Sequence, residues 1–431
     1  MQQPTYEQTL EYLFAQLPMF SRIGAAAMKP DLHNTQALLA FLGNPEKQFK
    51  TIHIAGTNGK GSSSHMLAAI FQAAGYKTGL YTSPHLVDFR ERIKVNGEMC
   101  SQQFVVDFTE KVKASIEDIQ PSFFELTVGM AFEYFAQEKV DIAIIETGLG
   151  GRLDSTNVIT PELSLITNIS FDHMNILGDT LPAIAAEKAG IIKEHVPVVI
   201  GETQVSIIQV FKSKAQQLHA PIYFADQLLQ VTNQQYTPQY LTLDILHHNS
   251  GENIRYTLDQ TGKYQAKNIL GVLTAVRILR EQGWNLPEQT VQTALSQVKR
   301  LTGLRGRWEV IAEKPLTVLD VGHNEAGVGE ILAQLAMQQY NKLHIVTGFV
   351  RDKDVPKALS LLPKNATYYF TQAQIPRALP YDELAVLAQQ AGLTGNTYPT
   401  VKEAFAAAQL AAQPDDLLLV CGSFFIVAEV M

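Results

Sequence analysis

The chain has 431 residues, of which 46% are hydrophobic and 18% are charged, a balance typical of a folded globular protein and too apolar for a disordered one. Its formal net charge of −8 lacks the basic surplus of a nucleic-acid-binding protein, so we expect no nucleic-acid partner. The N-terminal residues have no basic region followed by an apolar core, and no apolar run is long enough to cross a bilayer. We therefore expect a cytoplasmic protein without a membrane partner.

Strand and helix patterns alternate over residues 50–193, and strands separated by helices indicate a mostly parallel sheet that is covered on both faces. The last helix of this series should have Pro182 in its first turn. In chain order the expected elements are a strand at Thr51–Ala55, a helix at Gly61–Ala74, a strand at Thr78–Tyr81, a helix at Phe124–Gln137, strands at Val140–Glu146 and Leu163–Thr167, and a helix that begins near Asp179 or Thr180.

The pattern changes at residues 222–258, where two runs flank a polar turn that contains glycine and predict an antiparallel hairpin. A second α/β series starts after the link Leu301–Gly306. We therefore predict an α/β fold with a phosphate-loop-containing, mostly parallel sheet domain over residues 1–300 and a smaller α/β domain over residues 301–431. The expected elements are the hairpin strands Tyr240–Leu246 and Ile254–Leu258, helices at Gln265–Gln282 and Pro287–Lys299, a strand at Leu316–Val321, a helix at Glu325–Gln339, and strands at Leu343–Thr347 and Leu417–Cys421.

A glycine-rich loop, GTNGKGS over residues 56–62, joins the first strand to the following helix. Glycines let backbone N–H groups converge on phosphate oxygens, the helix N-terminus adds partial positive charge, and Lys60 and Ser62 add an ammonium and a hydroxyl. The spacing departs from the strict G-x-x-x-x-G-K-[ST] pattern, because Gly61 separates the lysine from the serine. A simple glycine turn is the alternative, but the flanking strand and helix favour a site for ATP or GTP. The loop alone predicts no particular reaction.

Polar residues follow three of the expected strands. Glu146 ends the run VDIAIIE, Ser83 lies just after TGLY, and His173 follows LSLITNIS. Open α/β sheets bind ligands at the carboxyl edge of the strands, so these side chains are expected to converge on one crevice. A lone histidine at a strand end is more often only hydrogen-bonded than a metal ligand.

An ordered set of motifs resembles the folylpolyglutamate synthase/dihydrofolate synthase family, which is related to the Mur ligases of cell-wall synthesis. Each motif is weakly specific by itself, whereas the whole set in this order is highly specific and spans essentially the whole chain. The motifs are GTNGKGS, YTSPHL (Tyr81–Leu86), FRERIKVNG (Phe89–Gly97), SFFELT (Ser122–Thr127), ETGLGGRLDSTN (Glu146–Asn157), NISFDH (Asn168–His173), EKAGIIK (Glu187–Lys193), YQAKN (Tyr264–Asn268), GRWE (Gly306–Glu309) and LDVGHN (Leu319–Asn324).

The resemblance implies an ATP-dependent amide ligase with a nucleotide-binding N-terminal domain, a smaller Rossmann-like C-terminal domain that binds glutamate, and a cleft between them. The family moves the γ-phosphoryl group of ATP onto a carboxylate, and the amine of L-glutamate then attacks the acyl phosphate. The expected reactions make dihydrofolate from dihydropteroate and extend reduced folates with γ-linked glutamates, which belongs to folate biosynthesis and one-carbon metabolism. The alternatives are a polyglutamylating enzyme only, a Mur-type ligase or, from another class, a nucleotide-dependent switch with slow ATPase activity. We expect a monomer, because no heptad pattern or long apolar edge indicates an interface.

The resemblance also assigns catalytic roles. It implies that Ser83, Glu146 and His173 hold magnesium, with two ions expected, and that Glu146 and His173 act in catalysis together with Lys188. The matching lysine of the family is carbamylated by CO₂ to N6-carboxylysine, which adds an oxygen ligand for a second metal. From the pattern alone, Lys188 would be a surface lysine beside Glu187.

The remaining assignments concern the nucleotide and the substrate. One departure from the family is the pair Val321-Gly322, where Gly-Ala is usual, so the backbone freedom of glycine lies one position closer to His323. The segment Ile23–Leu32 lies where the family has another substrate loop, but its sequence diverges and no contacts are assigned to it. The resemblance places ATP at Thr57, Asn58, Gly59, Lys60, Gly61, Ser62, Asn268, Arg307 and Asp320, and the pterin substrate and glutamate at Phe123, Phe124, Glu125, Leu153 and His323. Without the resemblance, the aromatic residues would be assigned to the core, Asn268 to a helix face and Asp320 to a turn.

Overall fold

The computed structural model of the chain describes residues 3–19, 31–351 and 353–431. Its largest sheet has the strand order β4-β3-β2-β5-β1-β6-β7-β8 and is parallel except where β3 pairs with β2 and with β4. Mostly parallel strands need helical crossovers, so this sheet is covered on both faces. Its strands are β1 (Lys50–Ala55), β2 (Thr78–Tyr81), β3 (Ile93–Val95), β4 (Glu98–Met99), β5 (Ile142–Glu146), β6 (Leu163–Ile166), β7 (Val198–Ile200) and β8 (Ile222–Phe224).

Two further sheets follow along the chain. One is antiparallel, with the order β11-β10-β9, and the other has the order β12-β13-β17-β14-β15-β16 and is parallel except between β12 and β13. Their strands are β9 (Leu229–Tyr236), β10 (Leu241–His247), β11 (Asn253–Leu258), β12 (Glu309–Glu313), β13 (Leu316–Leu319), β14 (Leu343–Thr347), β15 (Thr367–Phe370), β16 (Gly395–Thr397) and β17 (Leu417–Cys421).

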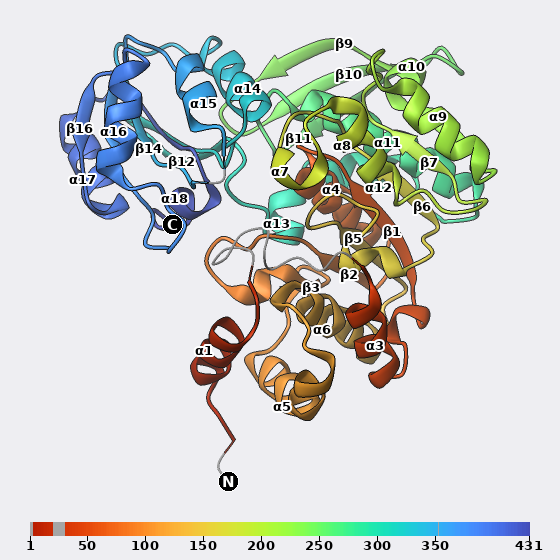
Figure 1. Cartoon of the computed structure of the whole chain (residues 1–431). Helices are drawn as coiled ribbons and strands as arrows, with labels where there is room; N and C mark the ends of the chain where they lie inside the picture. The colour runs from red at the N-terminus through yellow and green to blue at the C-terminus, as the bar shows by residue number, and fades with distance from the viewer. Residues whose placement is uncertain (1–2, 20–30, 352) are drawn as a thin grey trace.

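The helices cover these sheets (Figure 1). Helices α4, α11 and α12 pack on one face of the largest sheet, and α1, α3, α5 and α6 pack on the other. The last sheet lies between α14–α16 and α17–α18. The helices are α1 (Tyr6–Gln16), α3 (His33–Phe41), α4 (Lys60–Ala73), α5 (Gln102–Ile119), α6 (Phe123–Gln137), α7 (Met174–Leu177), α8 (Leu181–Ala189), α9 (Ile208–Gln217), α10 (Ala225–Leu228), α11 (Gln265–Glu281), α12 (Glu288–Leu295), α13 (Val298–Thr302), α14 (Glu325–Leu335), α15 (Val355–Leu361), α16 (Tyr381–Gln390), α17 (Val401–Ala411) and α18 (Phe424–Ala428); the short 3₁₀ turns are Pro45–Lys47, Phe89–Arg92 and Ser155–Val158.

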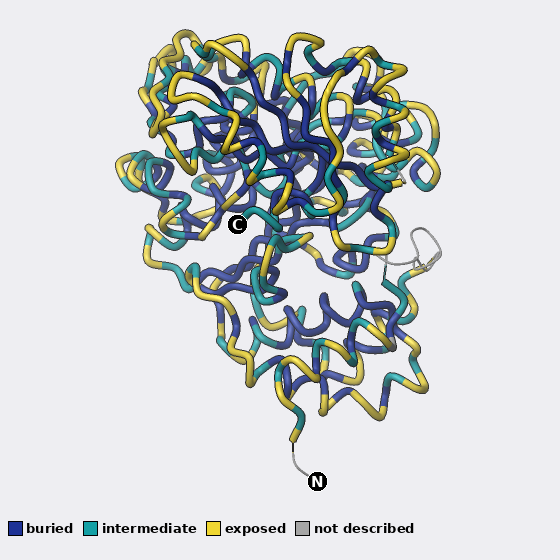
Figure 2. Tube along the Cα trace, turned by 90° about the vertical axis from the view of Figure 1, so that its left-hand side faces the viewer, coloured by how far each residue is buried: buried dark blue, intermediate teal, exposed yellow. Residues whose placement is uncertain are grey.

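Strand β5 shows why the central strands are continuous apolar runs. Ile142 and Ile144 face the core beneath α4, whereas Ala143 and Ile145 face the core beneath α6. Both sides of the pleat are therefore buried, and an alternating polar pattern would place polar groups in a core. Figure 2 shows the same burial for the whole fold: buried residues run through the interior, and exposed residues lie on the outer turns and helix faces.

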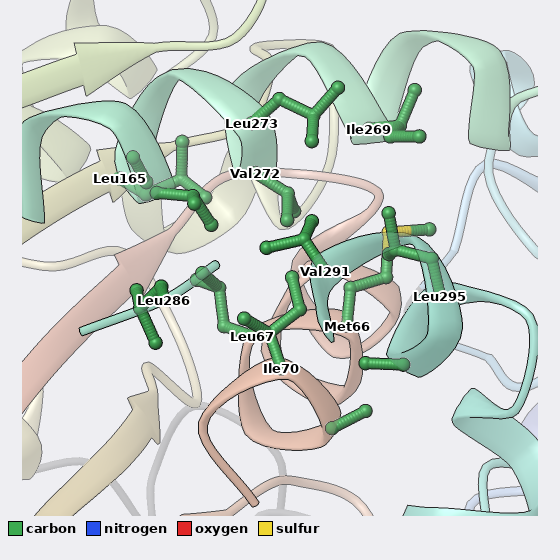
Figure 3. Close-up of a cluster of buried hydrophobic side chains, with 14 of the residues drawn as sticks. Met66, Leu67, Ile70, Leu165, Ile269, Val272, Leu273, Leu286, Val291 and Leu295 are labelled. Carbon is green, nitrogen blue, oxygen red and sulfur yellow. The ribbon is translucent and has the colours of Figure 1, made fainter. Parts of the chain in front are cut away.

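The helix that follows the phosphate loop is anchored by apolar packing. Met66, Leu67 and Ile70 of α4 meet Val272 of α11 and Val291 of α12 in one buried cluster (Figure 3). These side chains are fully or almost fully buried. The first turn of α4 is thereby held rigidly against the sheet, which fixes the direction of its backbone N–H groups.

The α/β fold and the mostly parallel first sheet are confirmed, and so is the antiparallel hairpin of β10 and β11. One expected helix is wrong. The pattern over Pro287–Lys299 predicts a single helix, but the chain leaves helical geometry at Gln297 (φ −139°, ψ 22°) between α12 and α13. The backbone N–H of Lys299 donates instead to Asp259 Oδ2 at 2.7 Å. This long-range bond replaces a helical one, and no local pattern predicts it.

The strands of the last sheet all lie after residue 308. This arrangement agrees with the proposed division of the chain into residues 1–300 and 301–431, which stays a prediction. Within the described residues, every helix is too short or too polar to cross a bilayer.

The α4 packing predicts a stability effect. Leu67 is completely buried, so Leu67→Ala should lower the free energy of unfolding by about 2–5 kcal/mol, because it removes apolar contacts and leaves a cavity. Leu410→Ala on α17 is the control: Leu410 is 87% exposed, and its replacement should change the free energy by less than about 0.5 kcal/mol. Urea unfolding followed by circular dichroism measures both. Equal urea midpoints for the two variants would contradict the packing described here.

Candidate active site

A cavity of about 840 Å³ opens at the carboxyl ends of β1, β2, β5 and β6 and is walled by both halves of the chain. Every predicted site residue contributes to its wall, so the structure brings all of them together. Their individual roles stay predictions. These residues are Thr57, Asn58, Gly59, Lys60, Gly61, Ser62, Ser83, Phe123, Phe124, Glu125, Glu146, Leu153, His173, Lys188, Asn268, Arg307, Asp320 and His323.

The phosphate loop is held in a shape that needs glycine. Gly59 has a φ of +83°, and a Cβ atom there would lie 2.2 Å from Asn268 Oδ1. The Lys60 ammonium folds back over the loop and donates to the carbonyl oxygens of Gly56 at 3.2 Å and Thr57 at 3.3 Å. Backbone amides, a helix N-terminus and an ammonium thus surround one small volume, which is the arrangement that binds phosphate.

A second lysine lies at the same carbonyl. Lys188 of α8 donates from Nζ to Gly56 O at 2.8 Å, and the residue is only 4% exposed. The pattern-based expectation of a surface lysine is therefore wrong, because the packing of α8 turns this side chain inward. Burial and the nearby charge of Lys60 lower the pKa of Lys188 to about 7. A substantial fraction of this amine is therefore uncharged at neutral pH.

Glu146 ends β5 beneath the loop and is 4% exposed. Its Oε2 accepts a long hydrogen bond of 3.4 Å from the backbone N–H of Ser83. Burial raises the pKa of Glu146 to about 7, although Lys60 and Arg307 act in the opposite direction. A Cβ atom on Gly61 would lie 3.2 Å from Arg307 Nη2 and 3.7 Å from Glu146 Oε2, so the guanidinium and the carboxylate both border the loop.

His173 lies at the start of α7 in a left-handed conformation, with a φ of +49°. Its Nε2 is 3.1 Å from the Lys353 ammonium. Burial lowers the pKa of His173 to about 3, opposed by the adjacent Asp172, so the imidazole is neutral at physiological pH. Neutral imidazole is the form that binds metals. In the described part of the chain, no three His, Cys, Asp or Glu side chains form a metal-binding group, so a cation here would also need Ser83 or ligand oxygens.

Asp172 and Lys353 are among the charged residues of this cavity that were not assigned from the sequence. Asp172 is paired with Lys353, which follows β14 in the other half of the chain. Burial alone would raise the pKa of Asp172, but the hydrogen bond to His323 and the charge of Lys353 hold it well below its usual range. The motif NISFDH contains Asp172 and could have indicated it. The pairing with Lys353 spans a sequence separation of 181 residues and leaves no local signal.

A pair of amides also joins the two halves of the chain. Asn58 in the phosphate loop and Asn324, which caps α14, exchange hydrogen bonds of 3.3 and 3.1 Å. Asn324 Nδ2 also donates to Asp172 Oδ2 at 3.1 Å, and His323 Nε2 lies 3.6 Å from the same oxygen. The loop, the end of β6 and the motif LDVGHN therefore form one network.

The predicted nucleotide residues beyond the loop have internal partners. Asn268 donates to Gln265 Oε1 at 2.7 Å, and Gln265 donates to Ser62 Oγ at 3.1 Å, which ties α11 to the start of α4. The Asp320 carboxylate accepts bonds from the Tyr264 hydroxyl at 2.8 Å and the Trp308 backbone N–H at 2.9 Å. Asp320 thus holds the link on which Arg307 lies.

The predicted pterin wall is aromatic and only partly open. The Phe123 ring lies 5.5 Å from Phe14 and 5.8 Å from Phe89. The Glu125 carboxylate accepts the backbone N–H of Ser122 at 2.6 Å and completes the cap of α6. These contacts support the helix and the core, and the substrate contacts of these residues stay predictions. Residues 23–30 of the other suggested substrate loop lie outside the described residues.

Comparisons with known proteins agree with this geometry. A family model described as the Mur ligase middle domain matches residues 54–276, and one described as the Mur ligase, glutamate ligase domain matches residues 306–424. The dihydrofolate synthase/folylpolyglutamate synthase of Bacillus subtilis (strain 168) is 34% identical over 415 residues, which cover 94% of this chain and 94% of that relative. The chain belongs to the dihydrofolate synthase/folylpolyglutamate synthase family of Mur ligases. The family predicted from the ordered motifs is confirmed, and the protein is an ATP-dependent ligase.

Solved structures of this family match nearly the whole enzyme. Escherichia coli FolC in complex with DHPP and ADP has a TM-score of 0.84 at 27% identity, covering 99% of this chain and 97% of that chain. A bifunctional folylpolyglutamate synthase/dihydrofolate synthase with Mn, AMPPNP and L-glutamate bound has a TM-score of 0.83 at 29% identity, covering 100% of this chain and 99% of that chain. The enzyme therefore has the ligase fold of its family.

The contact between Gly59 and Asn268 predicts a binding defect. Gly59→Ala should weaken ADP binding roughly tenfold or more, because the methyl group must displace the Asn268 amide from beside the loop. Gly75→Ala is the matched control: Gly75 has a similar φ of +90°, but a methyl group there meets nothing within 4 Å. Both variants place alanine at a positive φ, but only Gly59→Ala changes the phosphate loop and meets Asn268, and calorimetric titration with ADP compares them. Equal ADP affinities in the two variants would contradict this placement of the nucleotide.

Proposed function

We propose that the enzyme joins L-glutamate to dihydropteroate and adds γ-linked glutamates to reduced folates at the expense of ATP. The observation that carries this proposal is the convergence in one cavity of a phosphate loop, a buried carboxylate at a strand end, a buried lysine of lowered pKa and an aromatic wall. The name of the Bacillus subtilis relative and the ligands of the two solved structures support these substrates.

The chemistry follows from the charges in the cavity. Amide formation in water needs an activated carboxylate. An acceptor carboxylate oxygen attacks the γ-phosphorus of ATP, the bond to the ADP oxygen breaks, and an acyl phosphate forms. The glutamate amine then attacks the acyl carbon, inorganic phosphate leaves and the nitrogen loses a proton. Both steps move anionic oxygens, so Lys60, Arg307 and the loop amides contribute by positioning and charge stabilisation.

The residues present fit a divalent cation. Glu146 is buried with a pKa raised to about 7, so its carboxylate is poorly stabilised by protein groups alone and would be favoured by a cation. The Ser83 hydroxyl and the neutral imidazole of His173 would complete the protein ligands, and phosphate oxygens would supply others. A bound Mg²⁺ would supply positive charge to the phosphates of ATP. The presence of two ions is part of this proposal.

Lys188 suits carbamylation. Its amine is buried, lies 2.8 Å from a backbone carbonyl and has a pKa lowered to about 7. The neutral amine attacks the carbon of CO₂, a nitrogen–carbon bond forms and one proton is released, which converts the neutral amine into an anion with two oxygens. That anion would offset the Lys60 charge at the same carbonyl and provide a metal ligand.

We also propose that the enzyme is cytoplasmic and works as a monomer. Sedimentation analysis would test the oligomeric state.

The proposed function makes ADP release depend on two co-substrates. With ATP and Mg²⁺, ADP should form only when an acceptor, dihydropteroate or tetrahydrofolate, and L-glutamate are both present. A coupled assay in which each component is omitted in turn measures this. ADP release without either co-substrate would instead support a nucleotide switch, and products from tetrahydrofolate alone, identified by mass spectrometry, would restrict the enzyme to polyglutamylation.

The carbamylation proposal predicts a pH dependence. CO₂ reacts with the unprotonated amine, so incorporation of ¹³C-bicarbonate at Lys188 should rise as the pH increases through about 7. Carbon NMR of labelled enzyme measures it. Lys188→Ala should lose the signal and most activity, and short carboxylic acids should restore part of that activity. An unmodified lysine in the active enzyme would contradict the proposal.

A further inference from the structure

The motifs YTSPHL and FRERIKVNG contribute a buried arginine to the cavity that the proposed mechanism does not use. Arg92 is the last residue of the 3₁₀ turn that precedes β3, lines the cavity and is 9% exposed. Its Nε donates to Nδ1 of His85 at 2.8 Å, and its guanidinium lies over the Phe123 ring, 5.6 Å from the centroid. These two contacts hold the Arg92 guanidinium in one position at the cavity wall.

Arg92 has neutral neighbours where a buried cation normally has an acid. Among the described residues, none of the ion pairs within 4.0 Å includes it. Of the two nearby acids, Glu91 uses its carboxylate to accept the backbone N–H groups of Leu86 and Val87, each at 2.8 Å, and Glu146 acts on Arg92 only through space. A buried guanidinium without a carboxylate is costly, and an aromatic face, an imidazole nitrogen and the neighbouring Tyr81 hydroxyl offset only part of that cost.

The nearby Arg90 shows the contrast. It lies two residues earlier, and its guanidinium binds the Asp88 carboxylate at 2.7 Å in a two-point contact. The same short turn therefore holds one arginine that is neutralised within the protein and one that is not. Only Arg92 of this pair lines the cavity.

The place of Arg92 indicates its ligand. It lies between the aromatic wall at Phe123 and the strand-end edge at Ser83, since His85 holds it from the segment that follows Ser83. Arg92, Phe123 and Ser83 line the same cavity, so an aromatic acid that rests on this wall would place its carboxylate within reach of the guanidinium. The five N–H donors of arginine match a carboxylate, and Nε is the one that His85 uses.

We propose that Arg92 binds a carboxylate of the acceptor substrate and that His85 is a positioning residue that orients the guanidinium. This inference rests on the proposed function. The carboxylate has two possible sources. One is the reacting group, which dihydropteroate and tetrahydrofolate both carry. The other is the α-carboxylate of the terminal glutamate, which stays free during γ-linkage and which dihydropteroate lacks.

Steady-state kinetics with both acceptors test Arg92. Arg92→Gln should raise the KM for the acceptor by roughly 10- to 100-fold, the effect of losing a charge-assisted hydrogen bond, while the KM for ATP stays within about twofold. A raised KM for both acceptors would show that Arg92 binds the reacting carboxylate. A raised KM for tetrahydrofolate alone would show that it binds the α-carboxylate. Arg90→Gln removes the same charge two residues away and should leave both acceptor KM values unchanged.

Unchanged acceptor KM values in Arg92→Gln would overturn the inference while leaving the proposed function intact. A wild-type enzyme that ligates glutamate to neither acceptor would overturn both. Because Arg92 is buried, AMPPNP affinity and the melting temperature serve as folding controls. If Arg92→Gln does not fold, Arg92→Lys keeps the charge without the planar fork and should still raise the acceptor KM at an unchanged ATP KM. Wild-type acceptor KM values in Arg92→Lys would then overturn the inference.

Two variants of His85 distinguish the effect of its hydrogen bond with Arg92 from the effect of its size. Asparagine places an amide oxygen near the position of Nδ1, so His85→Asn should keep the bond from Arg92 and an acceptor KM within about threefold of wild type. His85→Leu removes the hydrogen-bond acceptor and should reproduce the KM increase of Arg92→Gln with little change in kcat. Acceptor KM values in His85→Leu that match the wild type would contradict the positioning role.

Discussion

The active-site cavity is organised around one backbone oxygen that receives two ammonium groups. Lys60 reaches the Gly56 carbonyl from the phosphate loop, and Lys188 reaches it from α8. Two cations so close together repel each other, and burial increases that repulsion. Burial and, after it, the charge of Lys60 lower the pKa of Lys188, and the site as a whole favours anions. Phosphate groups and a modified lysine are two ways to supply the missing negative charge.

The charged side chains of the cavity come from both halves of the chain. The N-terminal half supplies the loop and Glu146, whereas Arg307, Lys353 and His323 come from beyond residue 300. The bonds of Asn324 to Asn58 and of Lys353 to Asp172 cross between the halves and end on residues at the phosphate loop and the end of β6. A change in the loop on nucleotide binding would therefore reach the C-terminal half directly, through side chains already in contact.

Most of the fold could be predicted from the sequence because it depends on short-range patterns. The apolar runs of β1, β2 and β14, the glycines before α4 and the turn between β10 and β11 are all local signals, and the structure places these elements within about two residues of their predicted bounds. The break between α12 and α13 was not predictable, because Asp259 captures the Lys299 amide from a distant segment.

The site was predicted less completely for a related reason. The sequence predicted that the loop, Glu146 and His173 lie in one crevice, because each follows the end of a strand. The burial of Lys188 depends on how α8 packs, and the partners of Asp172 and Asn58 come from the other half of the chain. Such contacts arise only in the folded chain. The cap formed by Glu125 illustrates the converse: a residue within a recognised motif also has a purely structural task.

The central claim is that this cavity activates a carboxylate by phosphoryl transfer, and an isotope experiment tests it most directly. Dihydropteroate labelled with ¹⁸O in its carboxylate is incubated with the enzyme, ATP, Mg²⁺ and L-glutamate, and the inorganic phosphate is analysed by mass spectrometry. The account predicts that each turnover transfers one carboxylate oxygen to phosphate, so the phosphate acquires the label in step with product. Amide product formed together with unlabelled phosphate would contradict it.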